Sequence, residues 1–160
     1  MRFLVGGYTA PEGSATGIAV LDAGAPDDAL AGGQLRGEGD AVTVTGSPSW
    51  ITPHPTLDVV YAALEGAGTV QAFRRVGPER LATLGVAVPA GDAVCQVAVS
   101  PDSAFLVASC WGDGRVVRMR LDAAGLPSRP VESAAPVDPH GSAATQAHTA
   151  AASGGTEEVI

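Results

Sequence analysis

Two stretches of the chain repeat each other at an offset of 46 residues, from residue 49 to residue 95. Residues 49–74 read SWITPHPTLDVVYAALEGAGTVQAFR, and residues 95–120 read CQVAVSPDSAFLVASCWGDGRVVRMR. Each stretch contains three apolar runs separated by a Pro-containing turn and a Gly-x-Gly turn. Such runs are typical of strands, and Ala67-Gly68 and Asp113-Gly114 stand where a hairpin needs positive φ. The chain therefore repeats a unit of three strands and two turns.

A fourth strand fits residues 81–88, which completes a four-stranded unit. Repeats of about this length with four strands are typical of β-propeller blades, whereas a helical repeat would show an apolar period of about 3.6 residues. We therefore predict an all-β fold, a β-propeller built from four-stranded antiparallel blades. Closed propellers usually have about four to eight blades, and this chain has sequence for about three.

The blades are assigned to residues 1–46, 47–92 and 93–135, and a fourth begins within 146–160. The first blade lacks an inner strand, and its other strands are predicted at residues 3–5, 17–21 and 42–44. We expect an incomplete ring, which is either the product of a truncated reading frame or a protein that assembles with further propeller sequence. Unpaired blade edges would also permit self-association.

Charge and hydropathy exclude several classes of partner. The net charge is -8, lysine is absent, and the nine arginines form no cluster larger than Arg74-Arg75, so we expect no nucleic-acid binding. The apolar runs are too short to cross a bilayer, and we expect no membrane contact.

Met1–Val5 leads directly into two glycines, which leaves no room for a secretory signal and favours a cytoplasmic location. Cys95 and Cys110 are predicted to be core or wall thiols.

A candidate site follows from the direction of the strands within a blade. Successive strands run antiparallel from the channel outward, so the start of the innermost strand and the end of the second strand lie at the same face. Glutamate and histidine act as general bases, hydroxyl and amide groups stabilise an oxyanion, and indole rings form pocket walls. Among the residues at these strand ends, we predict that Glu65 and His148 are catalytic. The predicted substrate-binding residues are Tyr8, Thr9, Trp50, Gln96 and Trp111.

Each of these residues also has an ordinary structural interpretation. Glu65 follows a strand and precedes a turn, where carboxylates are usually solvated, and His148 stands at a strand start. Trp50 and Trp111 are alternatively packing residues. His140 and His148 lack the close spacing of zinc ligands, so we predict no metal site. The loops that bind phosphate groups and the Gly-x-Ser-x-Gly turn of serine hydrolases do not occur.

Three phrases resemble, in order, the first three blades of the lactonase family, the 6-phosphogluconolactonase-like seven-bladed β-propellers. They are FLVGGYTAPEGSATGIAVLD, SPSWITPHPTLDVVYAALEGAGTVQAF and VCQVAVSPDSAFLVASCWGDGRVVRMRLD. The resemblance covers residues 1–122 and is weaker beyond them. It implies about three blades of an expected seven. It also implies a hydrolase of carbohydrate metabolism that opens a sugar lactone, such as 6-phosphogluconolactone, by general-base-assisted attack of water and without a cofactor.

The family pattern is matched at some site positions and replaced at others. Glu65 falls on the family's glutamate after a Tyr-Ala-x-x strand, and His148 falls on the second histidine of its His-Ala-His phrase. Gln146 replaces the first histidine of that phrase, Gln96 replaces another histidine, and Leu64 replaces an asparagine that often precedes the glutamate. These replacements remove proton carriers from the mouth of the channel.

Two alternatives to an enzyme remain open. The family's Arg-Gln phrase is missing near residues 141–144, and Arg115, the nearest candidate for holding an anion, lies beyond a turn. The chain is therefore alternatively a truncated or degenerate, non-catalytic propeller fragment. A protein-interaction scaffold of the WD-repeat kind is disfavoured, because the Trp-Asp dipeptide of that repeat is absent.

Overall fold

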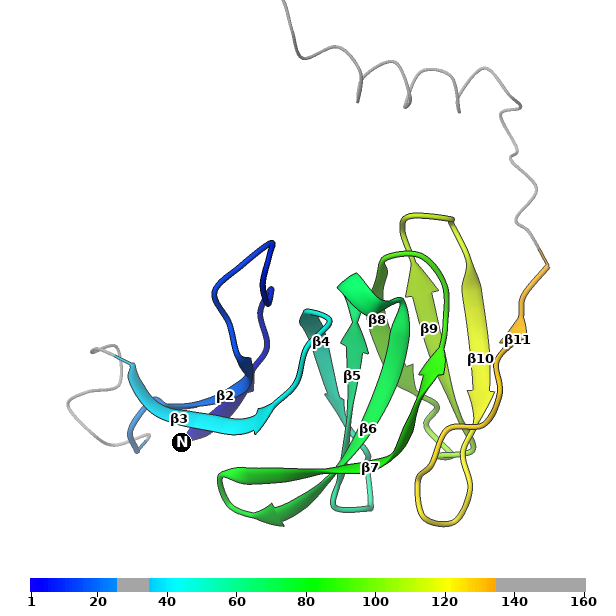
Figure 1. The fold of residues 1–160 in the computed structure, drawn as a ribbon. Coiled ribbons are helices and arrows are strands. Elements are labelled where there is room, and N and C mark those ends of the chain that lie inside the picture. Colours follow the sequence, from blue (N-terminus) through cyan, green and yellow to red (C-terminus); the bar gives the residue numbers. More distant parts are fainter. Residues whose placement is uncertain (26–34, 135–160) are drawn as a thin grey trace, which may run out of the picture.

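Each apolar run of the repeat forms one strand, and the strands are arranged in three antiparallel sheets (Figure 1). The computed structural model describes residues 1–25 and 35–134. The first sheet contains β1 (Arg2–Val5), β2 (Gly17–Asp22) and β3 (Arg36–Thr43). The second contains β4 (Pro48–Pro53), β5 (Val59–Leu64), β6 (Thr69–Gly77) and β7 (Arg80–Pro89). The third contains β8 (Val94–Val99), β9 (Phe105–Cys110), β10 (Val116–Arg120) and β11 (Val131–Glu132).

Neighbouring strands in each sheet follow one another in the chain, which is the pattern predicted for propeller blades. The predicted all-β fold is confirmed. The sequence assigned to a fourth blade, residues 146–160, lies outside the described residues. Apart from its strands, the described part of the chain contains a short 3-10 helix, η1 (Glu65–Ala67), and no helix there is long and apolar enough to cross a membrane.

The last strand of the first sheet is longer than the sequence predicts. A strand is predicted at residues 42–44, but β3 already begins at Arg36. Its first five residues are polar or glycine and are exposed, so they lack the apolar pattern of a buried strand. Two register shifts against β2 accommodate these residues. Hydrogen bonding to β2 therefore holds these exposed residues in the strand, although their side chains are not buried.

The repeat extends to the hydrogen bonds of the turns. His54 and Ser100 are equivalent positions at the end of the inner strand in the second and third sheets. His54 Nδ1 accepts hydrogen bonds from the backbone N–H of Thr56 at 3.1 Å and of Leu57 at 3.0 Å. Ser100 Oγ accepts one at 3.1 Å from the backbone N–H of Phe105, which is equivalent to Val59. The hydrogen bond that the two turns share is in the backbone, where the N–H of His54 donates to the carbonyl of Val59 at 2.8 Å and the N–H of Ser100 donates to that of Phe105 at 2.9 Å. The two side chains therefore both bond to the backbone of their own turn, but at different positions.

The core lies between the sheets, and β5 of the middle sheet is buried on both faces. Every residue of β5 is buried. Val59, Tyr61 and Ala63 pack in the cluster shared with the third sheet, and the alternate residues pack in the cluster shared with the first sheet. The buried residues of the first cluster are Val59, Tyr61, Ala63, Val70, Ala72, Ala90, Val94, Val97, Leu106, Ala108, Cys110, Val117, Met119 and Leu121. Those of the second are Ile18, Val20, Ala41, Val60, Ala62, Leu64, Phe73 and Leu81.

The two hairpin glycines provide a matched test of the repeat. Gly68 and Gly114 have φ of 65° and 67°, so replacing either by alanine should cost about 1 kcal/mol of unfolding free energy. A Cβ on Gly68 would lie 2.6 Å from the carbonyl oxygen of Gly91, whereas a Cβ on Gly114 would have no atom within 4 Å. We expect Gly68→Ala to be clearly more destabilising than Gly114→Ala in urea unfolding. Equal losses would contradict the packing of this turn.

Candidate functional site

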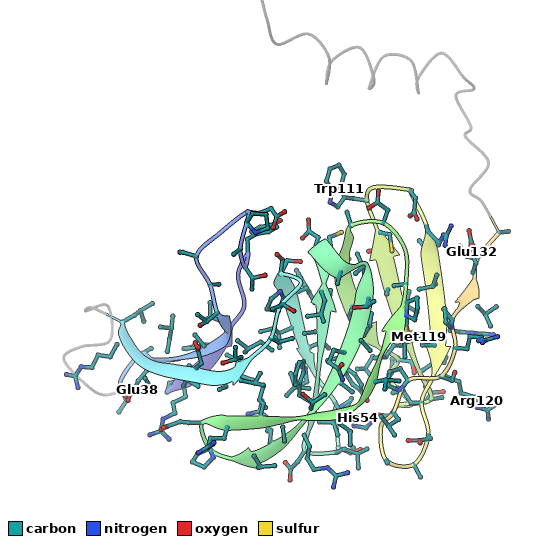
Figure 2. The ribbon with its side chains drawn as sticks, viewed as in Figure 1. Glu38, His54, Trp111, Met119, Arg120 and Glu132 are labelled. Atoms are coloured by element: carbon teal, nitrogen blue, oxygen red, sulfur yellow. The ribbon has the colours of Figure 1, made fainter. Side chains whose placement is uncertain are left out.

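Three side chains from three different sheets meet at one end of the blades. Tyr8 follows β1, Glu65 follows β5 and Trp111 follows β9. The Tyr8 hydroxyl lies 3.1 Å from each oxygen of the Glu65 carboxylate, to which it donates a hydrogen bond, and Trp111 Nε1 donates to Glu65 Oε1 at 3.2 Å. Figure 2 shows Trp111 at the end of the blades opposite His54. The structure thus brings together three residues that were placed at one mouth from the strand order alone.

Glu65 and Trp111 are held by the same backbone hydrogen bonds in consecutive blades. The N–H of Glu65 donates to the carbonyl of Ser47 at 3.0 Å, and the N–H of Trp111 donates to the carbonyl of Ala93 at 3.2 Å. Ser47 and Ala93 both have positive φ, of 60° and 50°. Because equivalent turns set both side chains, their meeting is a consequence of the angle between adjacent blades.

Thr9 joins the first two sheets from a buried position. It is 5% exposed, and its backbone N–H donates to Ser47 Oγ at 3.2 Å. The backbone N–H of Ser47 donates in return to Thr9 Oγ1 at 3.1 Å. These reciprocal hydrogen bonds fix the loop that carries Tyr8. Thr9 therefore positions Tyr8 from a buried place and is not itself on the surface of the site.

The predicted substrate-binding residues of the inner strands lie apart from the Glu65 carboxylate. Trp50 is 44% exposed, and its Nε1 donates to Thr52 Oγ1 at 3.0 Å. This hydrogen bond directs the indole toward the C-terminal end of β4. Gln96 is exposed on β8 and pairs with Ser109. The next pair, Val97 and Ala108, is buried in the core between the second and third sheets. The side chain of Gln96 therefore lies on the opposite face of the third sheet. His148 lies outside the described residues.

Ser49 and Cys95 occupy equivalent irregular positions on the inner strands. The pairing of β4 with β5 shifts across Ser49, and the pairing of β8 with β9 shifts across Cys95. The Cys95 thiol lies 3.7 Å from the carbonyl oxygen of Ser109, to which it donates. Of the groups that lower the pKa of Glu65, the Ser49 hydroxyl has the largest effect. Of these two equivalent positions, only the one in the second sheet therefore acts on the Glu65 carboxylate.

The carboxyl group of Glu65 is held in its ionised form. Partial removal from water raises its pKa, but donor groups of Ser49, Trp111 and Tyr8 outweigh this effect, and the pKa lies below its usual value. The buried Ser49 Oγ has no hydrogen-bond partner of ordinary geometry among the described residues, so the hydrogen bonds from Tyr8 and Trp111 are the ones that the geometry supports. The hydrogen bond to Glu65 and the negative charge of Glu65 raise the pKa of Tyr8. The site therefore pairs a carboxylate with a neutral phenol at neutral pH.

Comparison with known protein families identifies the fold. Residues 2–159 match the family model described as lactonase, 7-bladed beta-propeller. The chain belongs to this family. A comparison with curated proteins found no match.

Two solved structures share the fold of this lactonase-family chain. A protein from Bacteroides fragilis, provisionally assigned as a 6-phosphogluconolactonase, matches with a TM-score of 0.64 and 20% identity over 81% of this chain and 34% of that one. A protein from Lactobacillus plantarum matches with a TM-score of 0.66 and 18% identity over 82% of this chain and 36% of that one. The chain spans about a third of the length of these structures.

Sequence reasoning missed the contacts that connect the site to its surroundings. Thr52 Oγ1 accepts the hydrogen bond from Trp50 and donates to the carbonyl oxygen of Val97 at 2.6 Å, so it links the inner strands β4 and β8. The two-residue spacing of Trp50 and Thr52 places both on one face of a strand, and this signal was available.

Among the described residues, no group of three histidine, cysteine, aspartate or glutamate side chains is placed to hold a metal ion.

The contact between Tyr8 and Glu65 is measurable, because the chain has two tyrosines. Burial and the charge of Asp122 raise the pKa of Tyr61 to about 12, and its hydroxyl donates to the carbonyl of Gly125 at 2.7 Å. Glu65→Gln removes the negative charge that favours the protonated phenol, so we expect the pKa of Tyr8 to fall toward 10 while that of Tyr61 stays unchanged. Ultraviolet titration of tyrosinate measures both steps.

The Tyr8→Phe variant is the control for that titration. It should leave a single phenol that titrates at about pH 12. If Glu65→Gln leaves the lower tyrosine pKa where it is in the parent protein, the two side chains are not in contact in solution.

Proposed function

We propose that the mouth formed by Tyr8, Glu65 and Trp111 binds a sugar lactone and opens it by attack of water. Membership of the lactonase family supports this reaction class. The observation that carries the proposal is the Glu65 carboxylate, which two blades hold ionised at the mouth by hydrogen bonds from Tyr8 and Trp111. An ionised carboxylate beside a neutral hydroxyl and an indole supplies an acceptor, a donor and an apolar wall, which are the groups that a lactone ring requires.

In the proposed reaction, Glu65 accepts a proton from the water that attacks the lactone carbonyl. The water oxygen bonds to the carbonyl carbon, the ring C–O bond breaks, and the departing ring oxygen takes up the proton that Glu65 accepted from the water. The product is an open hydroxy acid, and Glu65 is again a carboxylate. Tyr8 keeps its proton at neutral pH because its pKa is raised, and it donates a hydrogen bond to the carboxylate. Trp111 is 71% exposed, and its Nε1 is fixed by Glu65, so its ring face is free to cover the sugar. His148 stays a predicted second base.

The reaction is tested by lactone hydrolysis with purified protein. We expect Glu65→Gln to lower kcat/KM by about 100-fold or more, because the amide cannot accept the proton. Glu79→Gln is the matched control, since Glu79 lies in the β6–β7 turn at the other end of the blade, where it pairs with Arg2 at 2.8 Å. Rates no faster than buffer for the parent protein, or equal rates for both variants, would reject the proposal.

A second candidate function is association through the face of the third sheet that points away from the second sheet. Val107, Val116 and Val131 are 36%, 39% and 58% exposed there and line a groove of about 360 Å³. Exposed apolar faces of this kind usually meet another protein surface. The proposed occupant is the first sheet of a second copy, whose outer residues Phe3 and Val5 are also exposed, at 48% and 38%. Contact between these two faces would join copies head to tail.

Association is tested by sedimentation over a range of concentrations. We expect Val116→Glu to shift the parent protein toward monomer, because a carboxylate would be buried between the two faces. Val86→Glu adds the same charge on β7, where the side chain is 82% exposed, and should leave the association unchanged. A parent protein that is monomeric at all concentrations would exclude this second function.

A further inference from the structure

Among the described residues, carboxylates outnumber cations beside the mouth that holds Glu65. Asp92 and Asp113 lie on adjacent loops, and the backbone N–H of Asp92 donates to Asp113 Oδ2 at 2.9 Å. A side chain on Gly112 would meet the Asp92 carboxylate, which places Asp92 against the turn that follows Trp111. Three acidic side chains therefore surround one end of the second and third blades.

Arg115 is the basic residue of this region, and its charge is already shared by two carboxylates. Its Nε lies 3.5 Å from Asp113 Oδ2 and 3.4 Å from Glu132 Oε1. Together with Glu65 and Asp92, Arg115 lines a hollow of about 390 Å³ between the second and third blades. Tyr8 and Trp111 do not line this hollow, so it adjoins the mouth, and Glu65 borders both. The wall of this hollow is therefore negative, although it contains a guanidinium group.

Three other basic side chains have contacts away from this hollow. Arg2 pairs with Glu79 at the far end of the blades, and Arg118 on β10 lies 5.8 Å from the ring centre of Phe105 on β9. His54 lies at the end of the blades opposite Trp111 (Figure 2). None of these three side chains is placed to bind an anion beside Glu65.

From this arrangement we infer that the site selects an uncharged sugar lactone and disfavours a phosphorylated one. The inference rests on the proposed lactone-opening function. A phosphate group carries nearly two negative charges and needs guanidinium or backbone N–H donors. If the lactone ring lies at Tyr8 and Trp111, a phosphate group that extends past Glu65 into the adjoining hollow would meet Glu65, Asp92 and an arginine that is paired with Asp113 and Glu132. A neutral sugar ring is not repelled by these carboxylates, and its hydroxyl groups are able to donate hydrogen bonds to them.

The experiment compares D-glucono-1,5-lactone with its 6-phosphate. We expect kcat/KM for the neutral lactone to be higher by roughly tenfold at low salt, and the ratio to fall as added salt screens the charges. Glu132→Gln frees Arg115 from one partner and should narrow the ratio. Glu38→Gln removes the same charge from β3, on the other side of the molecule (Figure 2), and should leave the ratio unchanged.

Failure of the inference is distinguishable from failure of the proposed function. An equal or greater kcat/KM for the phosphorylated lactone overturns the inference and leaves the lactone-opening function in place. If neither lactone is opened, the proposed function fails, and binding of D-glucose and D-glucose 6-phosphate, followed by tryptophan fluorescence, decides the inference. Tighter binding of the neutral sugar supports it. Tighter binding of the phosphorylated sugar, or binding of neither, overturns it.

Discussion

Alternate residues of β5 point in opposite directions, and both sets are buried. A strand of this kind has to be covered on each face by another sheet, because a single layer would leave a row of valine, alanine and leucine side chains in water. The first and third sheets supply this cover. Since side chains from both sides interlock, the angles between the three sheets are fixed by packing. The carboxylate that follows β5 inherits its position from this arrangement.

The site depends on the repeat as well as on the core. Glu65 and Trp111 occupy the same position in successive blades, and the N–H of each donates to a residue with positive φ at the start of an inner strand. A conformation that two blades share brings two different side chains to the same height above the sheets. Divergence of the sequence at such positions changes the chemistry of the mouth while the backbone stays the same. Glutamate in one blade and tryptophan in the next therefore form a contact that neither blade could form alone.

Most of the fold was predictable from the repeat, because apolar runs between Pro and Gly turns reflect burial directly. The first part of β3 was not, since residues 36–40 are polar or glycine and are held by pairing with β2, whereas its end falls within the strand predicted at residues 42–44. At the site, strand order predicted that Tyr8, Glu65 and Trp111 would lie at one mouth. It did not predict that the indole of Trp50 turns toward Thr52. A local side-chain hydrogen bond decided that direction, and no spacing in the sequence specifies it by itself.

The electrostatics of the mouth connect the packing to the chemistry. Burial alone would raise the pKa of Glu65, but donor groups that include Tyr8, which follows β1, and Trp111, which follows β9, lower it. These two donors reach the carboxylate only when all three sheets are packed, so the site is complete only in the packed structure. A group whose pKa is lowered by folding stabilises the folded state above its unfolded pKa, and this contribution is lost as the pH falls through the folded pKa. The same carboxylate that is proposed to accept a proton from water therefore also joins the blades, and protonating it weakens both functions together.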